Sequence, residues 1–223
     1  MNPKIAIISA VYGQSDPIKP TFPQNGDVEF LMITDDAGLA AGVVDPMGWK
    51  IIYEPRNDMA PVRAAKIPKL FPWRYTDRNF SVWIDGSMRL RSAFFANQII
   101  QSGNPIGMFP HPDRDCVFDE ARETLGMQRY SSQHALIAEQ MAEYAHHPHH
   151  HGLWATGIVS RRHTPDVVSF SEQWETEINR YSHQDQISLP IVARTSQLWP
   201  DSIKYGDIWK SNFHEFVPSG RHK

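Results

Sequence analysis

Two carboxylates that follow short apolar runs are the first residues of this chain that could carry chemistry. Asp35 follows the run 28–34 (VEFLMIT), and Asp85 follows the run 81–84 (SVWI). A buried strand that ends in a carboxylate places that group at the edge of a sheet, where α/β proteins bind ligands. Asp85 also has a structural alternative, because Asp-Gly is a common turn dipeptide.

Three cations precede Asp85 at steps of three residues: Arg63, Lys66 and Lys69. On a helical turn they would share one face. Such a face beside a carboxylate and a metal ion suits a diphosphate, because the cations contact the phosphate oxygens and the metal bridges them to the carboxylate. The alternative is a solvated basic face that binds no ligand.

The histidine-rich tract His146–His151 and the single cysteine, Cys116, could also bind a metal. Pro148 splits the tract, and metal sites favour defined spacing on rigid elements, so we interpret the tract as an exposed loop. Asp115 beside Cys116 disfavours a reactive thiolate. We therefore expect Cys116 to have a structural role.

The composition predicts one soluble folded domain and excludes several classes of protein. The 223 residues carry 22 Lys and Arg against 25 Asp and Glu, and a net charge of −3 argues against a binder of nucleic-acid polymers. No apolar run approaches the roughly 18 residues of a membrane span, and no cleavage site follows the run 5–11. We therefore expect a cytoplasmic protein.

Six short runs rich in β-branched or aromatic residues predict strands. They are 5–11, 28–34, 49–54, 81–85, 106–109 and 152–160. Helices are expected over 61–67, closed by Pro68, over 132–145, and over 164–181 with Thr164 as N-cap. Strands mixed with helices over one domain predict an α/β or α+β sheet flanked by helices.

Five sequence patterns follow one another along the chain, and the first of them contains the three cations and Asp85. They are Arg63-x-x-Lys66-x-x-Lys69 followed by Trp83-Ile84-Asp85-Gly86-Ser87, then His111-Pro112-x-Arg114-Asp115-Cys116-x-x-x-Glu120-Ala121, then Gly152-Leu153-Trp154-x-x-Gly157-Ile158-Val159-x-Arg161-Arg162-His163, then Trp174-x-x-Glu177-Ile178, and finally Ser182-x-x-Asp185-Gln186-x-Ser188. From Lys4 to about Ile191, the chain resembles a glycosyltransferase-like family of formerly unknown function. That family has plant, bacterial and phage members and is related to GT-A glycosyltransferases.

The resemblance implies an α/β fold: a single-domain GT-A-like (Rossmann-like) mixed central sheet flanked by helices. A nucleotide-binding half would cover about residues 1–110, an acceptor half about 111–205, and a C-terminal tail 206–223. The residues expected to hold the donor, a UDP- or GDP-sugar, are Ala10, Tyr12, Thr34, Asp35, Arg63, Lys66, Asp85, Gly86 and Ser87. Those expected at the acceptor substrate are His111, Arg114, Trp154, Thr156 and Gly157. Trp154 has core packing as its alternative.

The resemblance also implies a divalent cation, Mn²⁺ or Mg²⁺, at an Asp-x-Asp-like element. Asp85 would be the first ligand and Ser87 stands where the second Asp is expected, while His214 would be a late ligand. A hydroxyl is a weaker ligand for a hard cation than a carboxylate.

Asp185 is the implied catalytic residue, with Gln186 beside it and Glu120 as a second candidate base. Asp185 would accept the proton of the acceptor hydroxyl or stabilise an oxocarbenium-like centre. Its alternative is an N-cap of the next segment. Gln184 stands where the family usually has an arginine, so an ion pair that would orient Asp185 is missing.

The function implied is transfer of a sugar from a nucleotide-sugar donor to a hydroxyl of a glycan or protein, assisted by the cation. One alternative is a metal-dependent hydrolase whose ligands would be His111, Asp113, Asp115, Glu120 and His163. No His-x-x-x-His or Cys-x-x-Cys element of standard spacing supports it. The other is a non-catalytic carbohydrate-binding relative of the fold.

Overall fold

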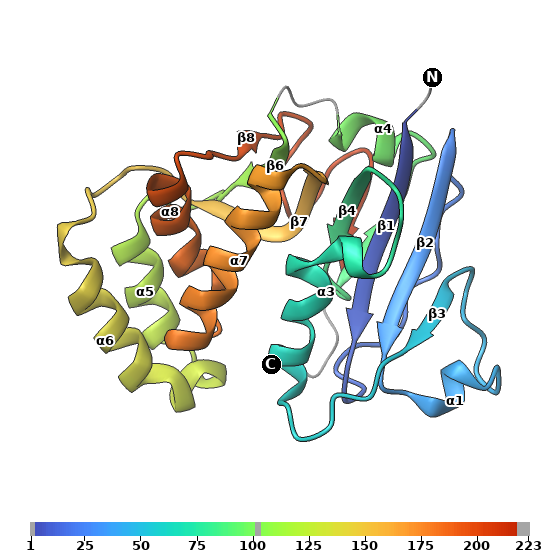
Figure 1. The fold of residues 1–223 in the computed structure, drawn as a ribbon, viewed down its shortest axis with the longest axis horizontal. Coiled ribbons are helices and arrows are strands. Elements are labelled where there is room, and N and C mark those ends of the chain that lie inside the picture. Colours follow the sequence, from blue (N-terminus) through green and yellow to red (C-terminus); the bar gives the residue numbers. More distant parts are fainter. Residues whose placement is uncertain (1–2, 101–103, 218–223) are drawn as a thin grey trace.

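The structure, a computed structural model, describes residues 3–100 and 104–217 and is built around a mixed sheet of seven strands (Figure 1). The strand order is β3-β2-β1-β4-β7-β6-β8. The strands are β1 (Lys4–Val11), β2 (Asp27–Thr34), β3 (Lys50–Tyr53), β4 (Phe80–Ile84), β6 (Ile106–Pro110), β7 (Trp154–Arg162) and β8 (Asp201–Ser202). β1 to β4 are parallel, and β7 runs antiparallel between β4 and β6. This architecture confirms the expected fold class.

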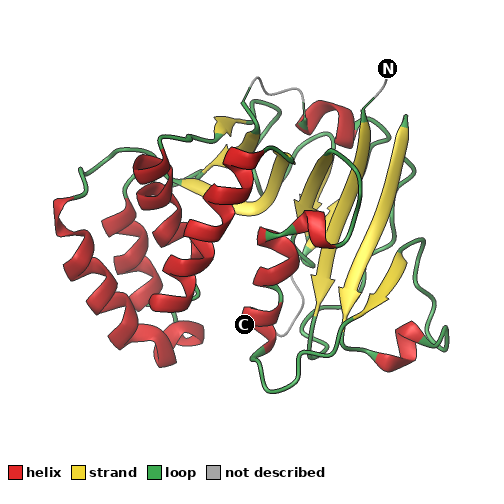
Figure 2. Ribbon diagram, in the orientation of Figure 1, coloured by secondary structure: helices red, strands yellow, loops and turns green. Residues whose placement is uncertain are grey.

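Helices cover the sheet and extend past one end of it (Figure 2). The α-helices are α1 (Ala37–Ala40), α2 (Pro61–Ala64), α3 (Lys66–Leu70), α4 (Phe95–Ile99), α5 (Val117–Leu125), α6 (His134–Glu143), α7 (Pro165–Arg180) and α8 (Asp185–Ser196). Short 3₁₀ helices cover Pro72–Arg74, Gln128–Gln133 and Tyr144–His146, and β5 (Met88–Leu90) pairs with β9 (His214–Phe216). Within the described ranges, none of the helices has the length and apolar character to cross a membrane.

The sheet is buried on both faces, which explains why β1 is apolar throughout. Ile5 and Ile7 belong to one buried cluster, which includes residues of α4 and β5. Ala6 and Ile8 belong to the other, which includes residues of α3, α7 and α8. A strand covered on both faces must be apolar at successive positions, and each large side chain so buried contributes about 1.5–3 kcal/mol.

The six predicted strands are confirmed to within two residues at each end, but the first predicted helix is wrong in form. The segment 61–70 makes two consecutive short helices, and Pro68 lies inside α3 instead of ending a helix. Thr164 occupies the N-cap of α7 as predicted, although its hydroxyl makes no capping hydrogen bond to the described first turn. Both α5 and α8 lie outside the predicted helices.

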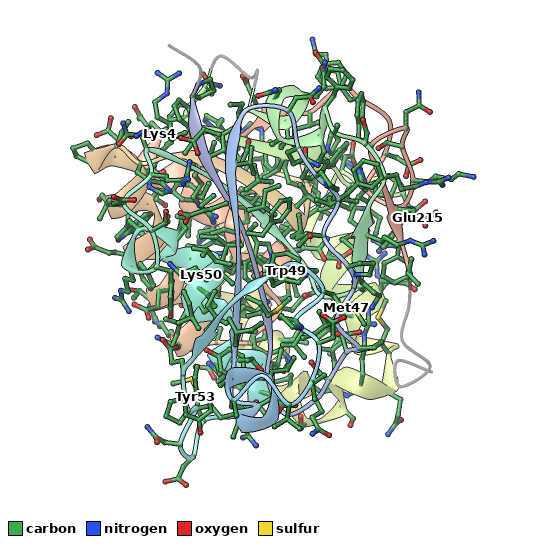
Figure 3. All side chains as sticks on the ribbon, turned by 90° about the vertical axis from the view of Figure 1, so that its right-hand side faces the viewer. Lys4, Met47, Trp49, Lys50, Tyr53 and Glu215 are labelled. Atoms are coloured by element: carbon green, nitrogen blue, oxygen red, sulfur yellow. The ribbon has the colours of Figure 1, made fainter. Side chains whose placement is uncertain are left out.

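The edge strand β3 faces the viewer in Figure 3, with Trp49 before its start and Tyr53 at its end. Trp49 is buried and its Nε1 donates to the Lys19 carbonyl (2.8 Å), whereas Tyr53 is half exposed. Lys50 is exposed on this strand. A short edge strand that carries a lysine resists pairing with other chains.

Candidate active site at the strand ends

Five strands end at one edge of the sheet, where the predicted donor residues lie. β1 to β4 run in one direction, and β6 shares it because both β6 and β4 are antiparallel to β7. β7 begins at the same edge, where Trp154 pairs with Pro110. The topology therefore gathers the ends of β1, β2, β3, β4 and β6 with the start of β7.

The turn after β1 is tied to the ends of β2 and β3. The Gly13 N–H donates to Asp35 Oδ1 (2.9 Å), and Arg56 Nε pairs with Asp35 Oδ2 (2.7 Å). The Tyr12 hydroxyl donates to Glu54 Oε1 (3.0 Å). Burial, reinforced by the Glu54 carboxylate, raises the pKa of Tyr12 well above its usual range. Tyr12 therefore stays protonated and acts as a hydrogen-bond donor.

Ala10, Tyr12 and Thr34, all expected at the donor, are buried in this arrangement. The Thr34 hydroxyl accepts from the Asp36 N–H (3.1 Å), and Asp36 Oδ1 in turn caps the start of α1. Asp35 remains partly exposed. Ala10, Tyr12 and Thr34 therefore support the turn from within the fold, whereas Asp35 is more exposed to solvent than these three.

Asp85 follows β4 directly and keeps its side chain 41% exposed. Its Oδ1 accepts from Trp83 Nε1 (2.7 Å) and lies 3.8 Å from Lys69 Nζ. Its N–H donates to the Gly157 carbonyl (2.8 Å), which fixes the turn against β7. A β-carbon at position 157 would lie only 3.4 Å from Asp85 Oδ2, so the glycine leaves this oxygen accessible.

The metal implied by the resemblance would find the Asp85 carboxylate and the partly exposed Ser87 at this turn. His214 is fully buried, and its ring nitrogens bond to the Ile208 carbonyl (3.1 Å) and to Ser211 Oγ (2.8 Å). A role for His214 as a metal ligand would require both bonds to break. One carboxylate and one hydroxyl fit an Mg²⁺ or Mn²⁺ that is held mainly by substrate phosphates.

The three spaced cations divide between two tasks instead of sharing one face. Lys66 Nζ and Lys69 Nζ both pair with Asp185 Oδ2, at 2.8 and 2.6 Å. Arg63 donates to two carbonyl oxygens at the C-terminal end of α7, at 3.1 and 3.3 Å. The lysines therefore face the site, whereas the guanidinium of Arg63 holds the end of a helix.

Asp185, the first residue of α8, is the buried charge at the centre of the site. Its side chain is 4% exposed, and its Oδ1 accepts from the Thr156 hydroxyl (2.9 Å). Burial alone would raise the pKa of Asp185, but Lys66 and Lys69 outweigh burial and hold that pKa well below its usual range. The expectation that an orienting ion pair is missing is therefore wrong, because two lysines of α3 supply it.

Glu120, in the first turn of α5, contacts two of the five predicted acceptor residues, Arg114 and His111. Its Oε2 accepts from Arg114 Nε (2.7 Å) and lies 3.6 Å from His111 Nε2. Its Oε1 accepts from the side-chain amide of Gln184 (3.0 Å). Burial lowers the pKa of His111, although Glu120 opposes this shift. His111 is therefore neutral at neutral pH beside a paired carboxylate.

Gln184 directly precedes Asp185 in the chain, and its side chain binds the other buried carboxylate, Glu120. It is the N-cap residue of α8, a position that the alternative interpretation had given to Asp185. Its amide oxygen accepts from the Tyr130 hydroxyl (3.2 Å), while its nitrogen binds Glu120. Sequence reasoning missed the contacts of Gln184 and Tyr130, for which the sequence carries no signal. The three-residue step drew attention to Lys69, but its pairing with Asp185 was not predicted.

The remaining predicted residues lie near this network with different surroundings. Trp154 is 9% exposed and packs against Trp199 in the core (ring centroids 5.9 Å apart), as its alternative interpretation had it. Gln186 is partly exposed in the first turn of α8. The Gly86 carbonyl accepts from Lys19 Nζ (3.1 Å).

The ligand set of the hydrolase alternative does not assemble. His163 follows the far end of β7, and its Nε2 bonds to Ser81 Oγ (2.9 Å) near the start of β4. His111 and Glu120 lie at the opposite edge, beyond the end of β6. The strand length between them separates His163 from the other proposed ligands.

Comparison with known proteins gives one family match. The family model described as TOD1/MUCI70, glycosyltransferase-like domain, matches residues 1–215 of the 223. A comparison with curated proteins finds no match. The matched range includes every residue of the site described above, among them Lys66, Asp85, Glu120 and Asp185.

Proposed function

Because the chain belongs to the TOD1/MUCI70 glycosyltransferase-like domain family, we propose that it transfers a sugar from a nucleotide-sugar donor to a hydroxyl of a glycan or protein. The observation that carries the proposal is the excess of positive charge buried behind the strand ends. Lys66 and Lys69 both pair with the buried carboxylate of Asp185. Two ammonium groups on one buried carboxylate leave an excess positive charge that attracts a diphosphate.

Asp85 is the proposed contact to the cation that accompanies the donor. Its exposed Oδ2 faces the space that Gly157 leaves, and Ser87 adds a hydroxyl. When bound, the cation would neutralise charge on the diphosphate leaving group. Trp83 and Lys69 keep the other oxygen of Asp85 in place through the contacts to Oδ1.

In the proposed transfer, the acceptor oxygen bonds to the anomeric carbon as the bond from that carbon to the diphosphate oxygen breaks. The nucleoside diphosphate leaves, and the hydroxyl proton passes to a base. Lys66 and Lys69 stabilise the negative charge that grows on the leaving group. Each is already positioned by Asp185, so little reorganisation is needed.

The two buried carboxylates receive different roles in this proposal. Asp185 binds two ammonium groups and a hydroxyl, and its lowered pKa makes it a weak proton acceptor. We assign it to positioning the lysines and to stabilising a cationic anomeric centre. Glu120 faces one guanidinium and one amide, so it is the better candidate for the base.

A donor screen by nucleotide release, with and without Mn²⁺, tests the activity. We expect release from one UDP- or GDP-sugar, dependent on an acceptor hydroxyl, and its loss in Asp85→Asn. Asp77→Asn is the matched control, because Asp77 is exposed before the start of β4, at the other edge of the sheet. Equal activity in the Asp85→Asn variant and the wild type would remove Asp85 from the proposed site.

Thermal shift separates an enzyme from a non-catalytic relative. Nucleoside diphosphate with Mn²⁺ at a hundredfold excess over its dissociation constant should stabilise the fold by about 2.7 kcal/mol. A shift without turnover of any donor would favour the carbohydrate-binding alternative. If neither UDP nor GDP gives a shift, the nucleotide-sugar proposal fails.

A further inference from the structure

A second group of metal-ligating side chains lies on the acceptor half, among residues to which the proposed transfer assigns no role. Cys116, Asp119 and His150 each offer one ligand atom, and these atoms all lie within 4.8 Å of one another. A fourth donor, His149 Nδ1, lies 3.5 Å from Cys116 Sγ. We propose that these four residues form a binding site for a zinc-class divalent cation.

The distances suit tetrahedral coordination of zinc. Zn–S bonds of about 2.3 Å and Zn–N bonds of about 2.0 Å at a tetrahedral angle separate the two ligand atoms by about 3.5 Å. Cys116 Sγ and His149 Nδ1 are 3.5 Å apart. The ligand atoms of Cys116, Asp119 and His150 lie no more than 4.8 Å apart, so inward movement of Asp119 and His150 by at most about 1 Å would close the site.

The chemistry of the donors selects the ion. A thiolate with imidazole ligands prefers zinc and related transition metals, whereas the hard ions Mg²⁺ and Mn²⁺ prefer oxygen. Asp119 uses Oδ1 for a surface pair with Arg122 (2.9 Å), which leaves Oδ2 for the ion. The site therefore differs in metal class from the cation proposed at Asp85.

Local structure already holds the ligands in place. Cys116 is the buried N-cap residue of α5, and Asp119 follows one helical turn later on the same face. The ring of His149 stacks on Phe118, with centroids 4.4 Å apart. His149 and His150 are exposed, as interpreted from the sequence, but both rings have partners in this loop.

Asp115 completes the arrangement from outside the ligand shell. Its Oδ1 lies 2.6 Å from His150 Nδ1, which leaves Nε2 of that ring for the ion. A carboxylate behind a ligating histidine fixes the ring and strengthens the ligand. The Gly152 N–H also donates to the Asp115 carbonyl (3.1 Å), so the loop is anchored at the same residue.

A metal here would clamp the start of α5 to the loop that leads into β7. α5 carries Glu120, and β7 carries Thr156 and Gly157. The ion would therefore stiffen the frame of the acceptor half without touching a reacting atom. This inference does not rest on the proposed transfer, because its readout is metal binding.

Cobalt titration of tag-free, chelator-treated protein tests the site. We expect one Co²⁺ per chain, with a thiolate-to-cobalt absorption band that Zn²⁺ abolishes by displacement, and a rise in melting temperature with zinc. Cys116→Ser should remove the band. His150→Asn, which tolerates the left-handed backbone at that position (φ 53°), should weaken zinc binding by more than about 100-fold, and Asp115→Asn by about 10-fold.

His146→Ala and His151→Ala are the matched controls, since both histidines belong to the tract but not to the described ligand group. Both controls should keep zinc affinity within about threefold of the wild type, a change of less than about 0.7 kcal/mol. Zinc binding that survives both Cys116→Ser and His150→Asn would overturn the proposal. So would binding that depends on His146 or His151, because it would indicate adventitious capture by a histidine-rich loop.

Discussion

At the scale of single residues, the buried carboxylate of Asp185 balances two lysines that have few other partners. Lys66 and Lys69 reach the same oxygen, and Asp185 is 3% exposed. Removing one member of a buried ion cluster leaves the others uncompensated, which costs about 3–5 kcal/mol. Urea unfolding at pH 7 should show this loss for Asp185→Asn, whereas the exposed Asp77→Asn should stay within about 0.5 kcal/mol of the wild type.

Acid should erase the difference between Asp185→Asn and the wild type. The pKa of Asp185 is lower in the folded chain than in the unfolded chain, because Lys66 and Lys69 outweigh the effect of burial. Its contribution is therefore present above the unfolded pKa of about 3.9 and is lost as the pH falls below that value. A difference in unfolding free energy that stays constant down to pH 2 would show that Asp185 is not ionised.

A substitution at Gly157 tests whether the cation binds at Asp85 without removing a charge from the site. A β-carbon there would lie 3.0 Å from Met88 Cε and 3.4 Å from Asp85 Oδ2. The methionine end is flexible, so we expect Gly157→Ala to cost less than about 1 kcal/mol of stability. Because the methyl group crowds Asp85, nucleotide binding with Mn²⁺ should weaken at least tenfold in calorimetry. Unchanged affinity would place the cation away from Asp85 Oδ2.

The sequence predicted several site residues individually but not the contacts between them. Asp85, Lys66, Asp185 and Glu120 were identified from motif order. Lys66 and Asp185 stand 119 positions apart, and their contact depends on how α3 packs beside α7 and α8. Local propensity contains no information on such packing, so Asp185 was expected to lack an ion-pair partner.

At the scale of elements, Arg63 connects α2 to the end of α7. Its two hydrogen bonds to carbonyl oxygens satisfy groups that a helix end leaves unpaired. We expect Arg63→Met to lower the unfolding free energy by about 1–2 kcal/mol, as charged hydrogen bonds are lost. Nucleotide affinity of the folded variant, measured by calorimetry, should stay within threefold. A tenfold loss of affinity at unchanged stability would instead support the diphosphate contact expected from the sequence.

The strands were predictable because each is a short apolar run with polar or turn-forming residues at its ends. The helix α8 was not, since Pro190 lies inside it and proline removes a backbone donor from a helix. α5 was missed although Val117, Ala121 and Leu125 recur every four residues, a helical period. Packing against α8 and α6 stabilises α5, and this tertiary support is invisible in a nine-residue segment.

At the scale of the whole molecule, a chain with a net charge of −3 keeps positive charge where the proposed ligand binds. Lys69, which pairs with Asp185, is 3% exposed, so its charge is poorly screened by solvent. The average charge therefore argues only against a nucleic-acid polymer, whereas the local field suits a single diphosphate.

Four histidines outside the metal group share one property, although they lie in different parts of the fold. Burial lowers the pKa of His147, His163 and His183 to about 4 in each case, and that of His214 in the same direction. His147, His163 and His183 therefore stay neutral in the fold near pH 5, where an unfolded chain would protonate them. Much of the histidine surplus is thus packed as neutral rings.

The fold should lose stability steadily as the pH falls from about 6.5 to 4. Over this range the histidines are protonated in the unfolded chain but stay neutral in the fold. Each therefore contributes up to about 1.4 kcal/mol per pH unit to the slope of the unfolding free energy against pH. Urea unfolding between pH 7 and 4.5 measures the total slope. His163→Gln keeps a polar group for Ser81, whose Oγ lies 2.9 Å from His163 Nε2. This variant should reduce the slope by up to about 1.4 kcal/mol per pH unit, the contribution of one histidine. His146→Gln, at an exposed position, is the control and should leave the slope unchanged. A wild-type unfolding free energy that does not depend on pH across this range would show that the buried rings are protonated in the fold.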